Sequence, residues 1–322
     1  MKFSLRFYFH KVKIEGADSV PKNTPLIVTP NHQNAFLDAL LVGAFIPIPL
    51  HYLARQDVFN KWTKPILSML QMIPIYRIRD GYSKLSLNDS IFESCFELFR
   101  SKESVLIFAE GNHGRYHFLR PLTKGAARLS LQAQSRLTED LMILPVGLNY
   151  FDHQSPKSTV IIKFGDPIPV KDYLEIYEEN QAKGLIDLRD RISDGMKNTL
   201  VIAEETSDYK EKADSIFRPE NEDLSFDELK SLEVSKGTIS KSGKEHVSAW
   251  IFNPIPMLTI HRAIMKFDDV VFHSSLKFGI GIFVFPIWWL TIFLLLLFST
   301  GINIALLAVI VMISGLYYSY LR

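Results

Sequence analysis

The sequence predicts an α/β domain with a mixed, mostly parallel sheet flanked by helices, followed by a C-terminal transmembrane helical hairpin. Two observations carry this prediction. Up to about residue 205, short β-branched or aromatic runs alternate with helical patterns, which is typical of a sheet covered on both faces. From residue 278 onwards, two long apolar runs follow each other with almost no charge between them.

The alternating part of the chain supplies the elements of the α/β domain in order. Strands are expected at residues 25–29, 51–55, 73–77, 105–110, 141–148 and 159–164, and helices at 35–45, 84–101 and 122–133. In the second helix, apolar residues recur every three to four positions at Leu87, Ile91, Cys95 and Leu98. This spacing places them on one helix face that can pack against the sheet.

The opening residues show a different pattern. Phe3, Leu5, Phe7 and Phe9 alternate with polar or basic residues. A period of two predicts either an edge strand or an amphipathic arm lying at a membrane interface.

Composition divides the chain into four segments. Residues 1–205 carry the α/β pattern, and 206–249 are polar enough to predict a linker or insert. Residues 250–277 predict an interfacial amphipathic segment, because their apolar run is too short to cross a bilayer. Residues 278–322 predict the transmembrane hairpin, since about 20 apolar residues suffice for one span.

Charge and cysteine content suggest the compartment. Lys266 and Lys277 precede the apolar runs and Arg322 ends them, so the positive-inside rule predicts an integral membrane protein with its α/β domain on the cytoplasmic face. The single Cys95 fits a reducing compartment. A formal net charge of +1 without a basic stripe argues against a nucleic-acid partner.

A histidine and an aspartate follow the first buried strand. His32 and Asp38 flank the turn into the next predicted helix, with five residues between them. An imidazole can take a proton from an alcohol, and a carboxylate can hold the imidazole in the required tautomer. Residues six apart do not share a helix face, so His32 must lie in the loop and the chain must fold back. A helix-start aspartate that merely suits the helix dipole is the other interpretation of this motif alone.

Three further blocks follow in order. One strand ends on Arg77, a second ends on the turn Glu110-Gly111-Asn112-His113-Gly114-Arg115, and a third contains Pro145. Together with the His–Asp motif, the ordered set resembles the glycerophospholipid acyltransferase superfamily, which includes the glycerol-3-phosphate and 1-acylglycerol-3-phosphate acyltransferases. The resemblance covers roughly residues 12–169 and makes residues 1–205 an acyltransferase domain.

The chain departs from the family pattern at several positions. The His–Asp spacing is one residue longer than in most of the family, Gln71 replaces a glycine, and Ala109, Asn112 and His113 replace the usual Pro, Thr and Arg. The long spacing and the Glu-Gly-x-His-x-Arg turn resemble the fungal glycerol-3-phosphate and dihydroxyacetone-phosphate acyltransferases.

The resemblance implies an O-acyltransferase of phospholipid synthesis. His32 and Asp38 would be catalytic. The residues implied for binding the acceptor or its phosphate are Arg77, Glu110, Gly111, His113, Arg115 and Lys124. The acyl donor would be acyl-CoA or acyl carrier protein, with no bound cofactor. The acceptor would be glycerol 3-phosphate or 1-acylglycerol-3-phosphate, and membrane lipids would be further partners.

Three alternatives stay open. His113 and His117, four apart, could join His32, Asp38 and Glu110 around a metal, although Gly111 and Gly114 disfavour a helix there. The second alternative is an acyl-thioester hydrolase, with water as acceptor. The third is a non-catalytic lipid-binding membrane scaffold, which would not need a histidine and an aspartate at this turn.

Overall fold

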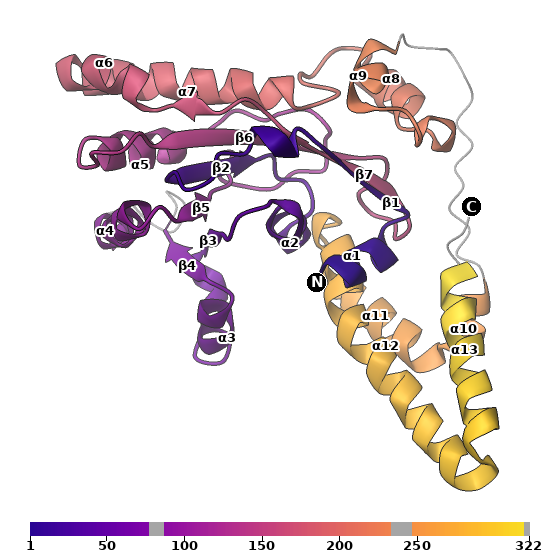
Figure 1. Ribbon diagram of the computed structural model, residues 1–322. Coiled ribbons are helices and arrows are strands. Elements are labelled where there is room, and N and C mark those ends of the chain that lie inside the picture. Colours follow the sequence, from indigo (N-terminus) through magenta and orange to yellow (C-terminus); the bar gives the residue numbers. More distant parts are fainter. Residues whose placement is uncertain (77–86, 233–246, 319–322) are drawn as a thin grey trace.

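A central sheet organises the chain. The computed structural model describes residues 1–76, 87–232 and 247–318. Within these residues, an eight-stranded sheet has helices on both faces (Figure 1). The strand order is β1–β7–β6–β2–β5–β3–β4, and the short β8 pairs with β6. The strands are β1 Lys11–Glu15, β2 Leu26–Pro30, β3 His51–Arg55, β4 Met72–Ile75, β5 Ser104–Leu106, β6 Met142–Tyr150, β7 Thr159–Phe164 and β8 Ile168–Pro169.

The strand directions confirm the predicted mixed, mostly parallel sheet. Strands β2 to β6 are linked by parallel pairings, whereas β7 and β8 run antiparallel to β6 and β1 runs parallel to β7. Parallel strands bring their carboxyl ends to one edge of a sheet, where α/β proteins commonly bind ligands. The loop after β2, which carries His32, therefore lies at that edge.

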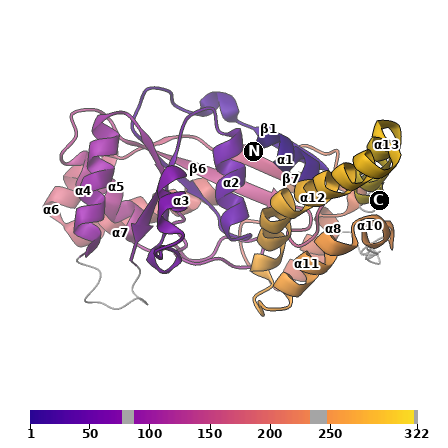
Figure 2. The ribbon, with the colours of Figure 1, turned by 90° about the horizontal axis from the view of Figure 1, so that it is seen from below.

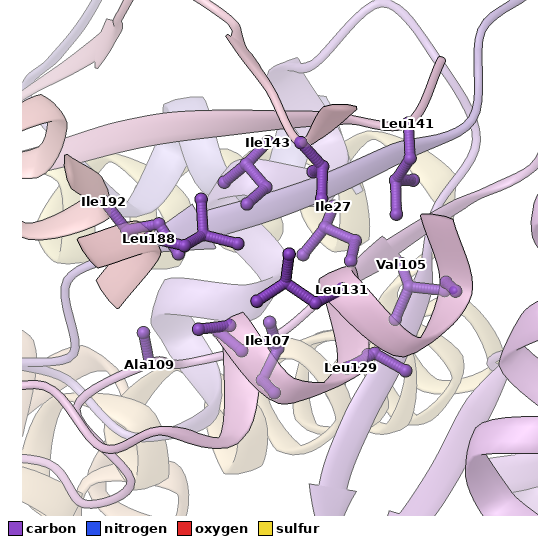
Figure 3. Close-up of a cluster of buried hydrophobic side chains, with 14 of the residues drawn as sticks. Ile27, Val105, Ile107, Ala109, Leu129, Leu131, Leu141, Ile143, Leu188 and Ile192 are labelled. Atoms are coloured by element: carbon purple, nitrogen blue, oxygen red, sulfur yellow. The ribbon is translucent and has the colours of Figure 1, made fainter. Parts of the chain in front are cut away.

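Alternating side chains of the buried strands feed two cores. Ile27 of β2 faces the core formed with α4 (Leu87–Arg100), α5 (Gly125–Gln134) and α7 (Gln181–Asn198), part of which Figure 3 shows. Leu26 and Val28 face the opposite core, formed with α1 (Lys2–Tyr8) and α2 (Phe36–Phe45). Because both faces are covered, β2 is apolar throughout its length.

Two short helices complete the α/β domain. Helix α3 (Lys64–Met69) precedes the edge strand β4, and α6 (Leu174–Glu179) leads into α7. Strand β5 ends at Leu106, earlier than the expected residue 110. The residues that follow leave the sheet and form the Glu-Gly turn of the candidate site described below.

The N-terminus is helical, so the strand expected there is wrong. Leu5 and Phe9, four residues apart, are buried in the core beside α2, whereas Phe3 is 82% exposed. The buried pair follows the helical period, and the alternation in the sequence includes exposed phenylalanines.

The segment expected to be a polar linker or insert is partly folded. Residues 209–231 contain α8 (Tyr209–Ile216) and α9 (Phe226–Ser231). Their apolar residues Ile216, Phe226 and Leu229 pack on Phe151 and Ile161 beside the β6–β7 hairpin. Ser225 and Glu228 form a capping box at the start of α9. The few apolar residues here are spaced so that each short helix buries one face. The low average hydrophobicity of the segment does not reveal this spacing.

Four C-terminal helices project from the sheet domain (Figures 1 and 2). They are α10 (Val247–Phe252), α11 (Pro254–Ile264), α12 (Val271–Thr300) and α13 (Ile302–Tyr318). Buried Asn253 joins three of them: its amide nitrogen donates to the Met312 carbonyl, and its oxygen accepts from the Trp289 indole. The stretch expected to be one interfacial segment is therefore two helices and the first turns of α12.

Helix α12 is the one helix in the described part of the chain that is long and apolar enough to cross a membrane. Only 6% of its most apolar window is buried, so it is not a core helix. Helix α13 is apolar and has 17 residues in the described part, at the lower end of the roughly 17 to 25 that one span takes. The two helices lie side by side as a hairpin turning at Gly301. That both of them span a bilayer remains a prediction.

Candidate active site

The loop between β2 and α2 brings His32 and Asp38 together. The Nδ1 atom of His32 lies 2.9 Å from Oδ2 of Asp38. The chain folds back through Ala35, whose φ of 47° is unusual for a residue with a Cβ atom. The fully buried Asp38 sits in the first turn of α2 and accepts hydrogen bonds from the Gln33 and Asn34 amides, each at 2.7 Å. The carboxylate thereby stabilises the loop that carries the histidine.

A tyrosine supplies the remaining donor to Asp38. The Tyr150 hydroxyl donates to Oδ1 of Asp38 at 2.6 Å from the end of β6. Tyr150 is fully buried, and burial together with the Asp38 charge raises its pKa well above the usual range. It therefore stays a hydrogen-bond donor. Sequence reasoning missed this residue, because it lies 112 positions from Asp38 and only the pairing of β2 with β6 brings the two together.

The imidazole of His32 is fixed but open on one side. Its ring stacks on Phe108 with a centroid separation of 3.7 Å and an interplanar angle of 15°. Since Nδ1 is turned to Asp38, Nε2 points away from it, and the side chain stays 15% exposed. This nitrogen accepts no hydrogen bond from the residues that the structure describes. A neutral imidazole with Nδ1 protonated can therefore accept a proton at Nε2.

Glu110 holds the backbone on the other side of His32. Its Oε1 accepts from the His32 amide at 2.7 Å, and its Oε2 lies 2.8 Å from Nε of Arg120. Burial raises the pKa of Glu110, while the charge of Arg120 and the His32 amide oppose the shift. The predicted acceptor-binding carboxylate thus has both oxygens engaged by the protein. Its place in the structure is that of a residue that positions the His32 loop.

Gly111 and Arg120 shape the turn. Gly111 has a φ of 70°, and a Cβ atom there would lie 2.9 Å from the Thr123 side chain. The Arg120 guanidinium donates to the carbonyls of His113 and Asn112. One cation thereby organises the turn and neutralises Glu110. Arg120 was not among the site residues expected from the sequence. The feature that could have pointed to it is its place as a basic residue directly before Pro121-Leu122-Thr123.

The other predicted binding residues are dispersed around this turn. His113 contacts the His32 ring edge-on at 5.6 Å between centroids, and burial lowers its pKa. Arg115 and Lys124 are exposed, with the Arg115 guanidinium 5.8 Å from the Tyr116 ring centroid. Arg77 lies outside the described residues. The structure thus brings His113 to His32 and leaves Arg115 and Lys124 facing solvent.

The start of α12 completes the site. The Ser275 hydroxyl donates to the Asn34 carbonyl at 2.5 Å and accepts from the Leu37 amide at 3.1 Å. Asp269, just before α12, pairs with His113 through Nε2 at 3.0 Å. The first turns of α12 are therefore bonded to the His32 loop, and the residue Asp269 ahead of the helix is bonded to the Glu-Gly turn. The sequence pattern did not indicate this connection.

Two other chemistries find no support in this arrangement. His117, considered above as a metal ligand, instead stacks on Phe217 with ring centroids 4.3 Å apart. No group of three His, Cys, Asp or Glu suited to a metal occurs in residues 1–76, 87–232 and 247–318. The thiol of Cys95 is buried in the opposite core, where burial raises its pKa to about 12, so it cannot act as a nucleophile.

Comparisons with known proteins identify similar sequences. Residues 11–149 match the family described as Acyltransferase. The chain is 30% identical over 125 residues to glycerol-3-phosphate O-acyltransferase 1 of Saccharomyces cerevisiae and 28% identical over 130 residues to glycerol-3-phosphate O-acyltransferase 2 of the same yeast. These matches cover 37% and 40% of the chain but only 16% and 17% of the relatives.

A solved structure is also similar. The 1-acyl-sn-glycerophosphate acyltransferase PlsC from Thermotoga maritima aligns with a TM-score of 0.44 and 18% identity, over 62% of this chain and 76% of that chain. The matched residues 11–149 contain every block that resembles the acyltransferases, from His32 to Pro145. The matched residues 11–149 therefore form a domain of the acyltransferase family, similar in sequence to the two yeast glycerol-3-phosphate O-acyltransferases.

Proposed function

We propose that the protein is an O-acyltransferase that moves a fatty acyl chain from acyl-CoA or acyl carrier protein to glycerol 3-phosphate or 1-acylglycerol-3-phosphate. The observation that carries the proposal is the buried, four-donor Asp38 holding Nδ1 of His32, with Nε2 left open. The names of the two yeast relatives support a glycerol-phosphate acceptor.

The proposed reaction needs no covalent intermediate. Nε2 of His32 takes the proton of the acceptor hydroxyl while that oxygen attacks the thioester carbonyl. The carbon–sulfur bond breaks as the new ester forms, and the leaving thiolate takes the proton from the imidazolium. Asp38 stabilises the imidazolium through Nδ1. General-base assistance of this kind contributes about 100- to 10,000-fold.

The acceptor phosphate would be bound near the Glu-Gly turn. Arg77 is proposed as its main ligand, because a guanidinium offers paired donors to phosphate oxygens. Gly111, His113, Arg115 and Lys124 are proposed to line the same region. Glu110 would act indirectly, through the His32 amide that it holds.

The proposal places the domain at a membrane surface. Helix α12 presents an exposed apolar surface long enough to span a bilayer. With Lys266 and Lys277 before the hairpin, both ends of the pair would be cytoplasmic. Alkaline carbonate extraction should leave the full chain in the membrane pellet, and its release into the supernatant would contradict the anchored form.

An acceptor panel tests the reaction type. Purified full-length protein is incubated with acyl-CoA or acyl carrier protein donors, and with glycerol 3-phosphate, 1-acylglycerol-3-phosphate or no acceptor. We expect acyl-lipid product only with one of the two acceptors. His32→Ala should abolish it, while the exposed His10→Ala, the matched control, should not.

The alternatives predict different products. Free fatty acid released at the same rate without an acceptor would identify a thioesterase and contradict the transfer. No product with any donor, and no difference between His32→Ala and wild type, would identify a non-catalytic scaffold.

A further inference from the structure

A second hollow lies away from His32, among the C-terminal helices. A cavity of about 370 Å³ opens between α1, α11, α12 and α13. Its walls are mostly apolar and aromatic, including Phe7, Trp250, Met257, Phe285 and Trp289. This volume falls within the range of about 300–1,000 Å³ typical of small-molecule sites.

One wall of the cavity carries a buried cation. Lys157 lines the cavity and is only 8% exposed. Its ammonium lies 4.6 Å from the centroid of the Phe7 ring and 4.2 Å from that of Tyr317. It forms no ion pair with a carboxylate in the described part of the chain. Two aromatic faces offset part of the desolvation of the charge, but an anion would offset far more.

The position of Lys157 is set by the backbone. Its φ is 58°, and its amide donates to the Tyr8 carbonyl at 2.6 Å. A buried lysine held in the left-handed region is costly for a residue with a Cβ atom. Burial also lowers the pKa of this ammonium to about 8. The lysine is therefore fastened to α1 at the cavity wall, and it does not extend into solvent as a surface lysine does.

The shape of the cavity depends on Gly281. This glycine lies on the inner side of α12, and a Cβ atom there would meet Phe285 at 3.5 Å and Ile260 at 3.9 Å. These are ordinary contact distances, so the backbone does not require a glycine there. A larger side chain at this position would occupy the cavity itself.

None of the lining residues falls within residues 11–149, the part matched by the acyltransferase family. The cavity is built from the N-terminal helix, the β6–β7 loop and the C-terminal helices. It lies one turn along α12 from Ser275, which holds the His32 loop. A cavity built wholly from segments outside residues 11–149 is separate from the proposed site of acyl transfer.

We propose that this cavity binds one acyl chain of an anionic membrane phospholipid, with the phosphate of that lipid beside Lys157. The apolar walls match the chain. The buried ammonium has no carboxylate partner within residues 1–76, 87–232 and 247–318, and it matches the phosphate. If α12 spans the bilayer as proposed above, the opening lies next to bilayer lipid. Lys277 also lines the cavity, and its ammonium donates to the Gln154 carbonyl at 3.2 Å. Bound lipid would brace α12, and through Ser274 and Tyr8 it would brace α1.

Native mass spectrometry of the full chain tests the proposal. The protein is released from mixed micelles that contain equal amounts of phosphatidylglycerol and phosphatidylcholine. We expect one retained lipid per chain, with phosphatidylglycerol favoured at least tenfold. Equal retention of the two lipids, or retention of neither, would overturn the proposal.

Two variants locate the lipid. Lys157→Asn removes the cation while keeping a residue that tolerates a positive φ, and it should abolish the preference for the anionic lipid. Gly281→Leu should reduce retention of both lipids at least tenfold. The matched controls are Lys210→Asn and Thr291→Leu, at exposed positions outside the cavity. Variants that behave like their controls would refute the assignment.

A second cavity-filling variant keeps the test possible if the first does not fold. If Gly281→Leu does not yield folded protein, Met257→Trp fills the cavity from α11 and should give the same loss. Binding is measured without turnover, so the result is independent of whether acyl transfer occurs. Loss of transfer in His32→Ala with lipid retention intact would separate the two sites.

Discussion

At the scale of single residues, Asp38 is the most strongly constrained group of the site. It has no exposed surface, and four donors converge on its two oxygens: His32, the Gln33 and Asn34 amides, and Tyr150. A buried carboxylate is tolerated only when its hydrogen bonds are complete. The same bonds set the orientation of His32, so structure and proposed chemistry depend on one residue.

Tyr150→Phe removes one of these donors and leaves the ring. A hydrogen bond to a charged group contributes about 1.5–3 kcal/mol, so kcat should fall about 10- to 150-fold. KM should change little, because Tyr150 is fully buried and positions Asp38 instead of contacting substrate. The partly buried Tyr177→Phe serves as control. An unchanged kcat in Tyr150→Phe would show that this bond does not support the base.

His117 makes the fold sensitive to acid. Burial, with a smaller contribution from His153, lowers its pKa from 6.5 to about 3. Its Nδ1 has no hydrogen-bond partner in the described residues. Below pH 6.5 the unfolded chain takes up a proton that the folded chain refuses, so stability is lost as the pH falls from 6.5 towards 3. Between pH 7 and 5 this amounts to about 2 kcal/mol.

Thermal unfolding in detergent at pH 7 and pH 5 measures this effect. His117→Phe keeps the stacking on Phe217 and should shrink the drop in melting temperature, whereas the exposed His10→Phe should not. The same drop in all three proteins would assign the acid sensitivity to other groups.

At the scale of elements, periodicity predicted what lies inside single strands and helices. Strands β3 and β7 have the expected bounds. Helices α2, α4 and α5 begin and end within three residues of the bounds expected for them. The helix at the N-terminus and the individual helices within residues 206–249 were not predicted, because their few buried residues are recognisable only against the surface they cover.

The same limit applies to the site. The His32–Asp38 pair is a local motif and could be found in the sequence. Tyr150, Arg120 and Ser275 could not, since their partners are set by strand pairing, by a turn or by a helix more than two hundred residues away. For Arg77 the expectation rests on sequence alone, as the residue lies outside the described part of the chain.

The turn before β4 contains a strained glutamine. Gln71 occupies a position where the acyltransferases that this chain resembles usually have glycine. Its φ of 59° lies in the left-handed region. Its side chain is exposed, and its carbonyl accepts a hydrogen bond from the Tyr52 amide. The effect of a substitution on stability therefore depends on the backbone conformation alone. Gln71→Gly should therefore stabilise the protein by about 1 kcal/mol.

Thermal unfolding compares this variant with Gln132→Gly inside α5. The second change should destabilise by about 1 kcal/mol, because glycine disfavours a helix interior. A lower melting temperature in Gln71→Gly would contradict the strain assigned to the turn.

Ser275 of helix α12 is bonded to the His32 loop. Ser275→Ala removes the bonds to Asn34 and Leu37 while leaving a small buried side chain. We expect kcat to fall about tenfold through the loss of about 1–2 kcal/mol of hydrogen bonding that positions the loop. The exposed Ser299→Ala on the same helix is the control. Equal activity of the two variants would show that α12 anchors the domain without shaping its site.

At the scale of the whole molecule, hydrogen bonds connect the sheet domain to the C-terminal helices. Glu110 holds the His32 amide, Ser275 of α12 bonds to the His32 loop, and Asp269, just before α12, pairs with His113. If α12 lies in a bilayer, Nε2 of His32 lies near the membrane surface. An amphiphilic acceptor and an acyl chain would both be available there.

The central claim is that Asp38 makes His32 a general base. Its most direct test is the single-turnover rate of acyl transfer by Asp38→Asn, compared with wild type at saturating substrates. The amide keeps the size of the side chain but cannot stabilise the imidazolium, so the rate should fall about 100- to 10,000-fold with the melting temperature showing a folded protein. A folded Asp38→Asn protein that transfers at the wild-type rate would contradict the account.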